Sequence, residues 1–296
     1  MEETNPKNCR ICGSGRLILK WNVGTFHVVK CLDCTAMMVA NTPTIQELSE
    51  HYSKVSDPAY YDTNRGQLCY YYEKLAAIIR KLRPEGKRIF DVGCSRGWFL
   101  GSMAGWECHG NEINEFEAGE ARKIAGVHIV QGPFETCPDY EEPFDVVTIQ
   151  DVLDHFIDPV AVVQKASAML RTGGLMVIKV HDFDCLWAQI TGKKFYAVIP
   201  PDHLTYFTRK SLRVLCEKNG FSVIRQAHYS QAITIPTIFF RLSHSNRNSF
   251  FGRIHTALEN TFLKHVTIRK NLNDIITIFA IKTAETGGIK SPKIST

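Results

Sequence analysis

The sequence predicts an α/β fold in which a doubly wound, mostly parallel sheet follows a small cysteine-rich N-terminal unit. Strand-sized apolar segments alternate with helical segments from residue 87 to about residue 230, a pattern that places helices on both faces of a parallel sheet. Four of the ten cysteines lie within the first 34 residues. The chain has 296 residues, 44% of them apolar and 22% charged, a composition that excludes disordered, collagen-like and coiled-coil proteins.

The alternating part of the chain contains the strands of the predicted sheet. Short runs of apolar and β-branched residues predict strands at 88–92, 107–112, 128–131, 144–150, 175–180 and 221–226. Helical spacing of apolar residues predicts helices over 159–170 and 209–219. Residues 274–282 are typical of one more strand.

The first 40 residues combine a predicted hairpin with two cysteine pairs. Short strands at 17–21 and 25–30 flank Asn22-Val23-Gly24, a turn that predicts the hairpin. Cys9-x-x-Cys12 and Cys31-x-x-Cys34 are separated by eighteen residues, and a hairpin brings two such pairs together around one tetrahedral zinc ion. Four thiolates leave no open position for catalysis, so we expect a structural zinc ribbon that the metal folds. The alternative interpretation is four free or redox-active thiols.

Residues 41–85 are expected to form a helical linker or lid. Thr44 is placed to cap a helix that runs through Tyr52, and 68–82 has apolar residues at helical spacing before Pro84. Between these helices, 56–61 is rich in turn formers and tyrosine, which predicts a loop. Within it, Tyr60 and Tyr61 either close over a site or pack between domains.

The segment 88–100 predicts a strand, a tight turn and the start of a helix. Gly93 and Gly97 allow the backbone to approach a ligand closely, and a helix start offers free amide donors. Such a loop alone suits a dinucleotide as well. Glu112 ends the next predicted strand, twenty-one positions after Asp91, where a carboxylate can accept hydrogen bonds from two ribose hydroxyls. The combination predicts a nucleoside-containing cofactor.

At these residues the sequence resembles the class I S-adenosylmethionine-dependent methyltransferases. The matching motifs are Asp91-x-Gly93-x-Ser95-x-Gly97, Gly110-x-Glu112, the run 144–155 and Pro201-Asp202-His203-Leu204-Thr205-Tyr206-Phe207-Thr208 with the helix and Asn219-Gly220-Phe221 that follow. The resemblance covers roughly 45–230 and the last strand. It implies a Rossmann-like, seven-stranded sheet in which 274–282 inserts antiparallel, and an S-adenosylmethionine-binding domain over 86–296 with a basic helical insertion at about 236–270.

The resemblance also implies roles for the residues around the loop. Asp91 would orient the loop and the methionine end of S-adenosylmethionine, and Glu112 would hold its ribose. Gly93, Ser95 and Gly97 would pass close to the cofactor, although many relatives have glycine where this chain has Ser95. Gln150 and Asp151, at the end of the fourth strand, would line the region of the methyl donor.

Two Asp-His pairs are candidates for the catalytic base, because histidine exchanges a proton near neutral pH. In zinc-ribbon sugar C-methyltransferases, which this sequence resembles, an acid-His pair before an aromatic turn supplies the base. Asp202-His203 occupies that place, so His203 is expected to be a base or substrate ligand, with Asp202 beside it. The alternative is a histidine that fixes the loop over the cofactor. His155, after Asp154, is a second catalytic candidate.

The expected acceptor is a small molecule, in particular a sugar or a glycan precursor. The rival interpretations are a zinc-ribbon RNA methyltransferase and a non-catalytic cofactor-binding module. Residues 1–40 carry a net charge of only +2, without the dense basic stripe that phosphate contacts require. An intact loop with Glu112 argues against a non-catalytic module.

The basic character of the chain belongs to one late segment. The net charge is +5, and 238–270 alone carries +5. Phenylalanine and leucine residues are interleaved there, so the segment either contacts an anionic membrane surface or a phosphorylated acceptor, or packs on the sheet as a solvated helix. The N-terminus is acidic and lacks an apolar signal region, and the apolar stretches are strand-sized, so a cytoplasmic protein is expected.

Overall fold

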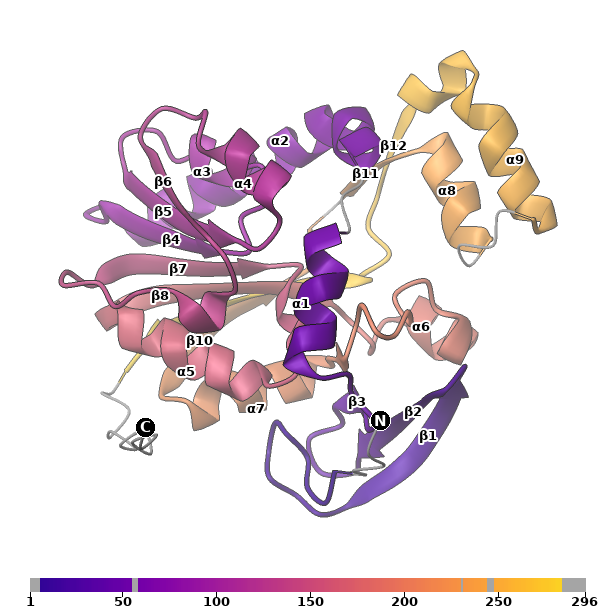
Figure 1. Ribbon diagram of the computed structural model, residues 1–296, viewed down its shortest axis with the longest axis horizontal. Coiled ribbons are helices and arrows are strands. Elements are labelled where there is room, and N and C mark those ends of the chain that lie inside the picture. The colour runs from indigo at the N-terminus through magenta and orange to yellow at the C-terminus, as the bar shows by residue number, and fades with distance from the viewer. Residues whose placement is uncertain (1–5, 55–57, 230, 244–247, 284–296) are drawn as a thin grey trace.

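The computed structural model describes residues 6–54, 58–229, 231–243 and 248–283 (Figure 1). Its centre is a seven-stranded sheet, as predicted. In spatial order the strands are β10 (Phe221–Ala227), β13 (Ile275–Lys282), β8 (Leu170–His181), β7 (Phe144–Gln150), β4 (Arg88–Val92), β5 (Glu107–Glu112) and β6 (Val127–Gln131).

Strand direction in this sheet is mixed in the predicted way. Strands β8, β7, β4, β5 and β6 run parallel, whereas β13 is antiparallel to both of its neighbours. Ile278 of β13 lies opposite Ile178 of β8. The last described strand is therefore inserted between β10 and β8. Strand β8 begins at Leu170, five residues earlier than predicted, because Leu170 already pairs with Phe144 of β7 before the register shifts to Leu175 opposite Val146.

Helices cover both faces of the sheet. Alternate residues of the central strands pack into the hydrophobic cores on opposite faces. Val146 of β7 packs with residues of α2 (Pro58–Leu82) and α3 (Trp98–Gly101), whereas Val147 packs with residues of α5 (Pro159–Met169) and α7 (Arg209–Lys218). Figure 1 shows these two helical layers on opposite sides of the sheet. The remaining short helical elements of this part are α4 (Glu115–Ala121), α6 (Leu186–Thr191), η1 (Phe134–Thr136), η2 (Leu153–His155) and η3 (Gly192–Lys194).

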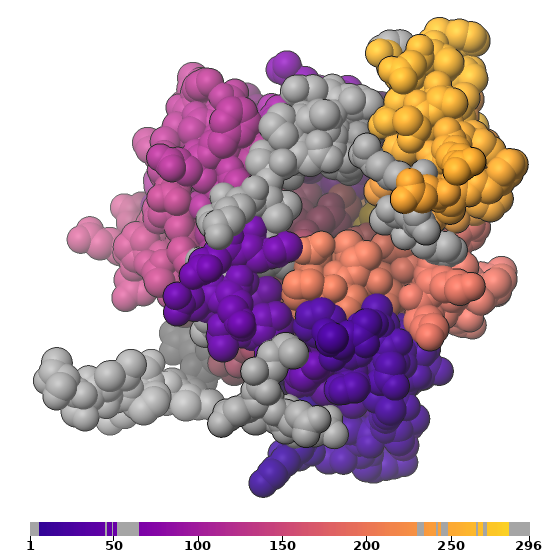
Figure 2. All heavy atoms as spheres, turned by 45° about the vertical axis from the view of Figure 1, so that its right-hand side comes forward, coloured from indigo at the N-terminus to yellow at the C-terminus, as the bar shows by residue number. Residues whose placement is uncertain are grey.

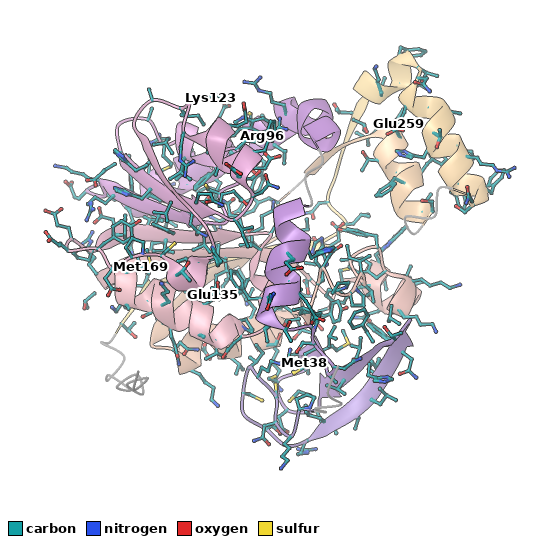
Figure 3. All side chains as sticks on the ribbon, viewed as in Figure 1. Met38, Arg96, Lys123, Glu135, Met169 and Glu259 are labelled. Atoms are coloured by element: carbon teal, nitrogen blue, oxygen red, sulfur yellow. The ribbon has the colours of Figure 1, made fainter. Side chains whose placement is uncertain are left out.

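The N-terminal unit forms a separate four-stranded sheet of β1 (Leu17–Val23), β2 (Phe26–Cys31), β3 (Met37–Val39) and β9 (Thr205–Tyr206). The predicted hairpin is present as β1 and β2, which pair antiparallel. The fourth strand comes from a distant part of the chain, because Met38 of β3 pairs with Thr205 of β9. Figure 3 places Met38 in this lower unit. The cysteine-rich segment therefore shares a sheet with the residues that follow His203.

The segment 41–85 is helical, as predicted, but its loop is shorter than expected. Helix α1 (Ile45–Lys54) is capped by Thr44, whose hydroxyl accepts from the amide of Glu47 at 3.2 Å while the Glu47 carboxylate accepts from the Thr44 amide at 2.8 Å. Helix α2 begins at Pro58, where a proline is well tolerated in the first turn, so the loop predicted over 56–61 was wrong from that residue on. The side chains of Tyr60 and Tyr61 lie outside the described residues.

The basic insertion is only partly helical. It consists of β11 (Gln231–Thr234), α8 (Ile235–Leu242), α9 (Phe250–Glu259), η4 (Phe262–His265) and β12 (Thr267–Lys270). Strands β11 and β12 pair antiparallel, so the helix predicted through residue 270 was wrong at its end, where alternating Thr267-Ile268-Arg269 favours a strand. Helices α8 and α9 contact each other through aromatic rings, among them Phe240 and His255 at 5.2 Å.

This insertion projects from the sheet at one end of the molecule (Figure 1). In Figure 2 the surface is hollowed where α8 and α9 face the rest of the chain. Phe250 and Phe262 are exposed on it, and its contact with an anionic surface stays a prediction. None of the helices in the described part of the chain is both long and apolar enough to span a bilayer.

Candidate functional site

The loop after β4 has the geometry of a ligand-binding turn. Gly93 and Gly97 have φ values of 66° and 69°, in the left-handed region that favours glycine. A Cβ atom on Gly93 would lie 3.0 Å from Val152, and one on Gly97 would lie 3.0 Å from Ala121. Both positions therefore require glycine for two reasons, backbone conformation and space. Ser95, between them, also has a positive φ of 48°.

Glu112, at the carboxyl end of β5, closes this loop. Its Oε2 accepts a hydrogen bond from the amide of Ser95 at 2.9 Å, and its Oε1 accepts from the amide of Asn114 at 2.9 Å. Burial raises the pKa of Glu112 against the effect of these amides. A buried ion pair between Arg96 and Glu117, with 2.8 Å from Nε to Oε2, supports the same turn, and Figure 3 shows Arg96 on this side of the sheet.

Asp91 lies beneath the loop, where its buried side chain accepts two hydrogen bonds. Its Oδ1 accepts from the Thr148 hydroxyl at 2.5 Å and from Nε2 of Gln150 at 3.4 Å. Burial raises the pKa of Asp91 to about 7. Among the described residues, the buried Ser95 Oγ and Gln150 Oε1 have no hydrogen-bond partner. Because unsatisfied buried polar atoms are rare, these two atoms are suited to the polar groups of a bound ligand, and the site fits the cofactor that the loop predicts.

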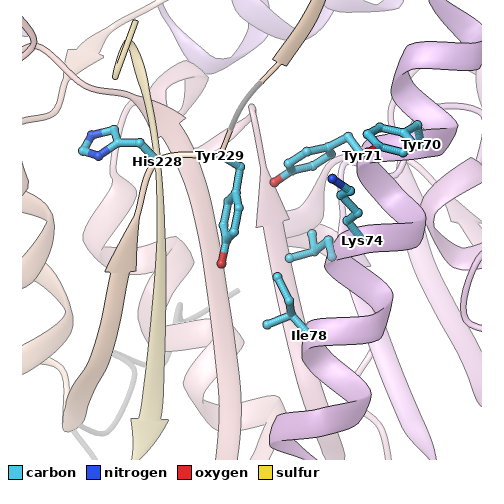
Figure 4. A pocket seen from close by; sticks show the side chains of 7 residues that line it. Tyr70, Tyr71, Lys74, Ile78, His228 and Tyr229 are labelled. Atoms are coloured by element: carbon cyan, nitrogen blue, oxygen red, sulfur yellow. The ribbon is translucent and has the colours of Figure 1, made fainter. Parts of the chain in front are cut away.

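Asp151 connects this region to a nearby pocket. Its carboxylate accepts from the buried Lys179 Nζ at 2.5 Å, and that ammonium lies 4.3 Å from the centre of the Tyr71 ring. Tyr71 lines a pocket of about 240 Å³ between α2 and the end of β10 (Figure 4). The residues around it are Tyr70, Tyr71, Lys74, Leu75, Ile78, His228 and Tyr229.

Asp154 is enclosed by three imidazoles at the adjoining strand ends. Its Oδ2 lies 3.3 Å from Nδ1 of His181, which ends β8, and 3.9 Å from Nε2 of His203. Its Oδ1 lies 3.8 Å from Nε2 of His155. Burial opposes the ionisation of Asp154, but the imidazoles outweigh it and hold the pKa of that carboxyl well below its usual range. Burial lowers the pKa of His203 to about 4. We refer to Asp154, His155, His181 and His203 as the histidine cluster.

The structure separates two residues that the sequence placed together. Oδ1 of Asp202 lies 2.5 Å from Nε2 of His51 in α1, whereas His203 faces Asp154. The sequence placed Asp154 only beside His155 and gave His181 at most a part in an acceptor pocket, and it did not predict that either residue would contact His203. Asp154 follows the carboxyl end of β7 and His181 ends β8, and because these two strands are parallel neighbours, their pairing brings the two residues together.

The four predicted cysteine ligands are brought together. Their Sγ atoms all lie within 4.8 Å of one another, with 3.5 Å between Cys9 and Cys34 and 3.5 Å between Cys12 and Cys31. Cys9, Cys31 and Cys34 are buried. Four thiols at these separations fit tetrahedral coordination of zinc, and the arrangement is consistent with a zinc ribbon.

Two contacts join this ribbon to the histidine cluster. The Thr35 hydroxyl, next to Cys34, lies 2.6 Å from the hydroxyl of Thr208. At the other end of the same segment, the amide of Leu204 donates to the carbonyl of Asp154 at 2.8 Å. The segment 204–208 therefore contacts both the residue next to Cys34 and the backbone of Asp154, whose side chain lies at the centre of the cluster.

Comparison with known proteins identifies the family. Residues 63–226 match a family model described as a methyltransferase domain, which is more than half of the chain. The chain belongs to this methyltransferase family. The predicted resemblance and the predicted Rossmann-like sheet are thereby confirmed, and the glycine loop and Glu112 both lie inside the matched residues.

Individual relatives of this methyltransferase are distant. The ubiquinone biosynthesis O-methyltransferase of Xanthomonas axonopodis pv. citri is 28% identical over 116 residues, which cover 36% of this chain and 47% of that protein. The chain spans about half the length of the curated relatives it matches.

Two solved structures show the same fold. The plantazolicin methyltransferase BpumL, in complex with a monoazolic desmethylPZN analog and SAH, has a TM-score of 0.51 at 12% identity, over 81% of this chain and 98% of that chain. A SAM-dependent methyltransferase of Thermotoga maritima, titled a possible histamine N-methyltransferase, has a TM-score of 0.50 at 18% identity, over 76% and 93%.

Proposed function

We propose that this protein transfers a methyl group from S-adenosylmethionine to a small-molecule acceptor, with a sugar or glycan precursor as the acceptor class. The observation that carries the proposal is the placement of Glu112 against the amide of Ser95 in a glycine turn, within a chain of the methyltransferase family. The histidine cluster follows β7, whose end also carries Gln150 and Asp151. Ligands of open α/β sheets bind at such carboxyl ends.

In this proposal, each residue around the loop contacts a different part of the cofactor. Glu112 accepts hydrogen bonds from the ribose hydroxyls, and Gly93 and Gly97 keep side chains out of the space beside the turn. Asp91 stabilises the methionine end with its buried carboxyl group. Gln150 and Asp151 line the region of the methyl donor. When bound, the cofactor supplies a methyl group on a positively charged sulfur, which a nucleophilic acceptor atom attacks.

We assign proton acceptance to the histidine cluster. His203 is buried and its Nδ1 lies 2.7 Å from the carbonyl oxygen of Ala197, whereas the His155 side chain is 25% exposed. His155 is therefore the member that an acceptor reaches, and His203 and Asp154 hold it in place. His155 would accept the proton that the hydroxyl group of the acceptor gives up during methyl transfer. Asp202, bound to His51, positions α1 beside this segment.

Zinc has a structural role in the proposal. Cys9, Cys12, Cys31 and Cys34 would hold it as thiolates, and a site closed by four sulfur ligands supports folding. A reducing cytoplasm keeps such thiols available for the metal.

A second acceptor class, an aromatic hydroxyl compound, is favoured by two observations. The curated relatives are named ubiquinone biosynthesis O-methyltransferases. The pocket beside Asp151 is lined by Tyr70, Tyr71 and Tyr229, whose rings stack on flat apolar ligands.

The test has two steps. Calorimetry with S-adenosylmethionine and its demethylated product measures cofactor binding to the wild type. Incubation with cofactor labelled in the methyl group, in the presence of nucleotide sugars or catechols, then identifies the methylated class by product mass. His155→Gln is expected to lower turnover about 100-fold with cofactor affinity unchanged, whereas His128→Gln, distant in sequence on β6, leaves both unchanged. Absence of cofactor binding to the wild type contradicts the proposal.

A further inference from the structure

The carboxylate of Asp154 and the ring nitrogens of His181 and His203 form a compact group of potential ligand atoms. All three lie within 4.8 Å of one another. We propose that these three side chains bind a divalent transition-metal ion, at a second metal site distinct from the four cysteines. The chemical class is a Mn²⁺, Fe²⁺ or Zn²⁺ ion, because two imidazoles and one carboxylate suit these ions better than Mg²⁺ or Ca²⁺.

The hydrogen bond of His203 fixes which nitrogen faces Asp154. Nδ1 lies 2.7 Å from the carbonyl oxygen of Ala197, and a carbonyl only accepts, so Nδ1 carries the proton. In the neutral ring Nε2 then has a free lone pair, and it faces Oδ2 of Asp154 at 3.9 Å. Two electron-rich atoms pointed at each other across this gap leave a place for a cation. A backbone carbonyl on the second nitrogen is also the usual outer partner of a metal-bound histidine.

Among the described residues, the charge of Asp154 is compensated by imidazoles alone, and His181 Nδ1 lies within hydrogen-bond distance of its Oδ2 at 3.3 Å. The side chain is 3% exposed, and its ion-pair partners among the described residues are the three imidazoles, with no lysine or arginine. Oδ1 is buried and has no hydrogen-bond partner in the described part of the chain. Burying a carboxylate without a compensating cation is costly, and a divalent ion removes that cost.

The separations allow coordination after a small closure. Metal–nitrogen and metal–oxygen bonds of about 2.0–2.2 Å keep two ligand atoms of one ion within about 4.4 Å of each other. The Asp154 Oδ2 distances of 3.3 and 3.9 Å to the two histidines already meet this limit. Atoms separated by as much as 4.8 Å need to approach by a few tenths of an ångström, which a side-chain rotation provides.

Three protein ligands leave coordination positions open, as in catalytic metal sites. His155, which lies beside the three proposed ligands and is partly exposed, marks the side from which an acceptor enters. The ion would hold acceptor oxygen atoms there and lower the pKa of a bound hydroxyl. This use of the ion rests on the proposed function, whereas the metal site itself does not.

Metal binding without any substrate tests the site directly. The probe is Mn²⁺, added to the full chain after its cysteine site has been loaded with zinc, because Mn²⁺ prefers oxygen and nitrogen ligands to thiolates. Calorimetry and elemental analysis should find one Mn²⁺ per chain in the wild type. His181→Asn and Asp154→Asn should each weaken Mn²⁺ binding at least about 10-fold to 100-fold, with zinc still bound.

Two control variants keep all three ligands. His155→Gln removes the neighbouring imidazole, and His128→Gln removes one that stacks on His109 away from the cluster; both should bind Mn²⁺ like the wild type. The inference is overturned if the wild type binds neither Mn²⁺ nor a second Zn²⁺, or if the ligand variants bind as tightly as the controls. Melting curves show that each variant folds. Binding of the demethylated cofactor in the same samples separates the two proposals, since either can fail while the other stands.

Discussion

The backbone amide of Val39 donates a hydrogen bond of 2.9 Å to the carbonyl oxygen of Leu204. Val39 ends the third strand of the cysteine-rich unit, and Leu204 directly follows His203. Since the Leu204 amide itself donates to the carbonyl of Asp154, a short backbone path leads from the cysteine site to the histidine cluster. The N-terminal unit therefore braces the candidate active site although its own ligands lie outside it.

Removing one of the four proposed zinc ligands should disturb the distant cluster. We expect Cys12→Ser to lose the metal and to lower the free energy of unfolding by more than about 4 kcal/mol, the range typical of a lost structural metal. The imidazole signals of His181 and His203 should shift in NMR spectra, because β9 loses its partner strand. Cys69→Ser, in α2, is the matched control and should change neither zinc content nor these signals. Unchanged histidine signals in zinc-free protein would show that the brace has no effect.

Gly97→Ala should harm both the fold and cofactor binding. The new Cβ would combine a φ of 69° with a 3.0 Å approach to Ala121, and we expect a loss of about 2–4 kcal/mol in the free energy of unfolding. Gly105 has a φ of 88° but open space around its Cβ position. Gly105→Ala thus isolates the conformational cost, about 1–2 kcal/mol, and should not affect calorimetric binding of the demethylated cofactor. Equal effects in denaturant titrations would exclude steric contact as the cause.

Glu112→Gln should weaken cofactor binding. An amide side chain offers one acceptor oxygen in place of two, and hydrogen bonds to a charged group contribute about 1.5–3 kcal/mol. We expect the Kd of the demethylated cofactor to rise about 10-fold to 100-fold in calorimetry. Glu115→Gln, exposed in the first turn of α4, provides the control. Wild-type affinity in Glu112→Gln would remove the ribose assignment.

Asp91 should make stability depend on pH. Its pKa is about 7 in the folded protein against an ordinary 3.8, so the native state holds the proton more tightly than the unfolded state. Stability from this group is therefore complete below about pH 4 and is lost as pH rises through 7, on the order of a few kcal/mol in total. The free energy of unfolding of Asp91→Asn, relative to the wild type, should rise across this window. Asp139→Asn, on an exposed loop, should follow the wild type; a parallel Asp91→Asn curve refutes the assignment.

The parts of the molecule that depend on local patterns were predictable from the sequence. The strands of the central sheet follow short apolar runs. The spacing of the Cys9–Cys12 and Cys31–Cys34 pairs is enough to predict a metal site. The Asp91 to Glu112 interval works in the same way, because one crossover between neighbouring strands sets it. The start of α2 at Pro58 and the β12 strand were missed, since turn-forming and β-branched residues there fit two local structures equally well.

The histidine cluster depends on tertiary structure. Adjacency in the sequence suggested the wrong pairing of Asp202 with His203. Asp202 and His203 are adjacent, yet one side chain contacts α1 and the other faces Asp154. His181 is separated from Asp154 by a whole helix and strand. Only the pairing of β7 with β8 brings their ends together, and no residue near either one signals that pairing.

The borrowed strand β9 also limits how this protein can be divided or recombined. An excised 1–40 fragment would present the open backbone of β3 to solvent, and a chain starting at residue 41 would leave Thr205 and Tyr206 without their partner. Unpaired edges of this kind promote association between copies. Engineering that exchanges the N-terminal unit between enzymes must therefore transfer β9 with it. The two segments form one structural unit although they lie far apart along the chain.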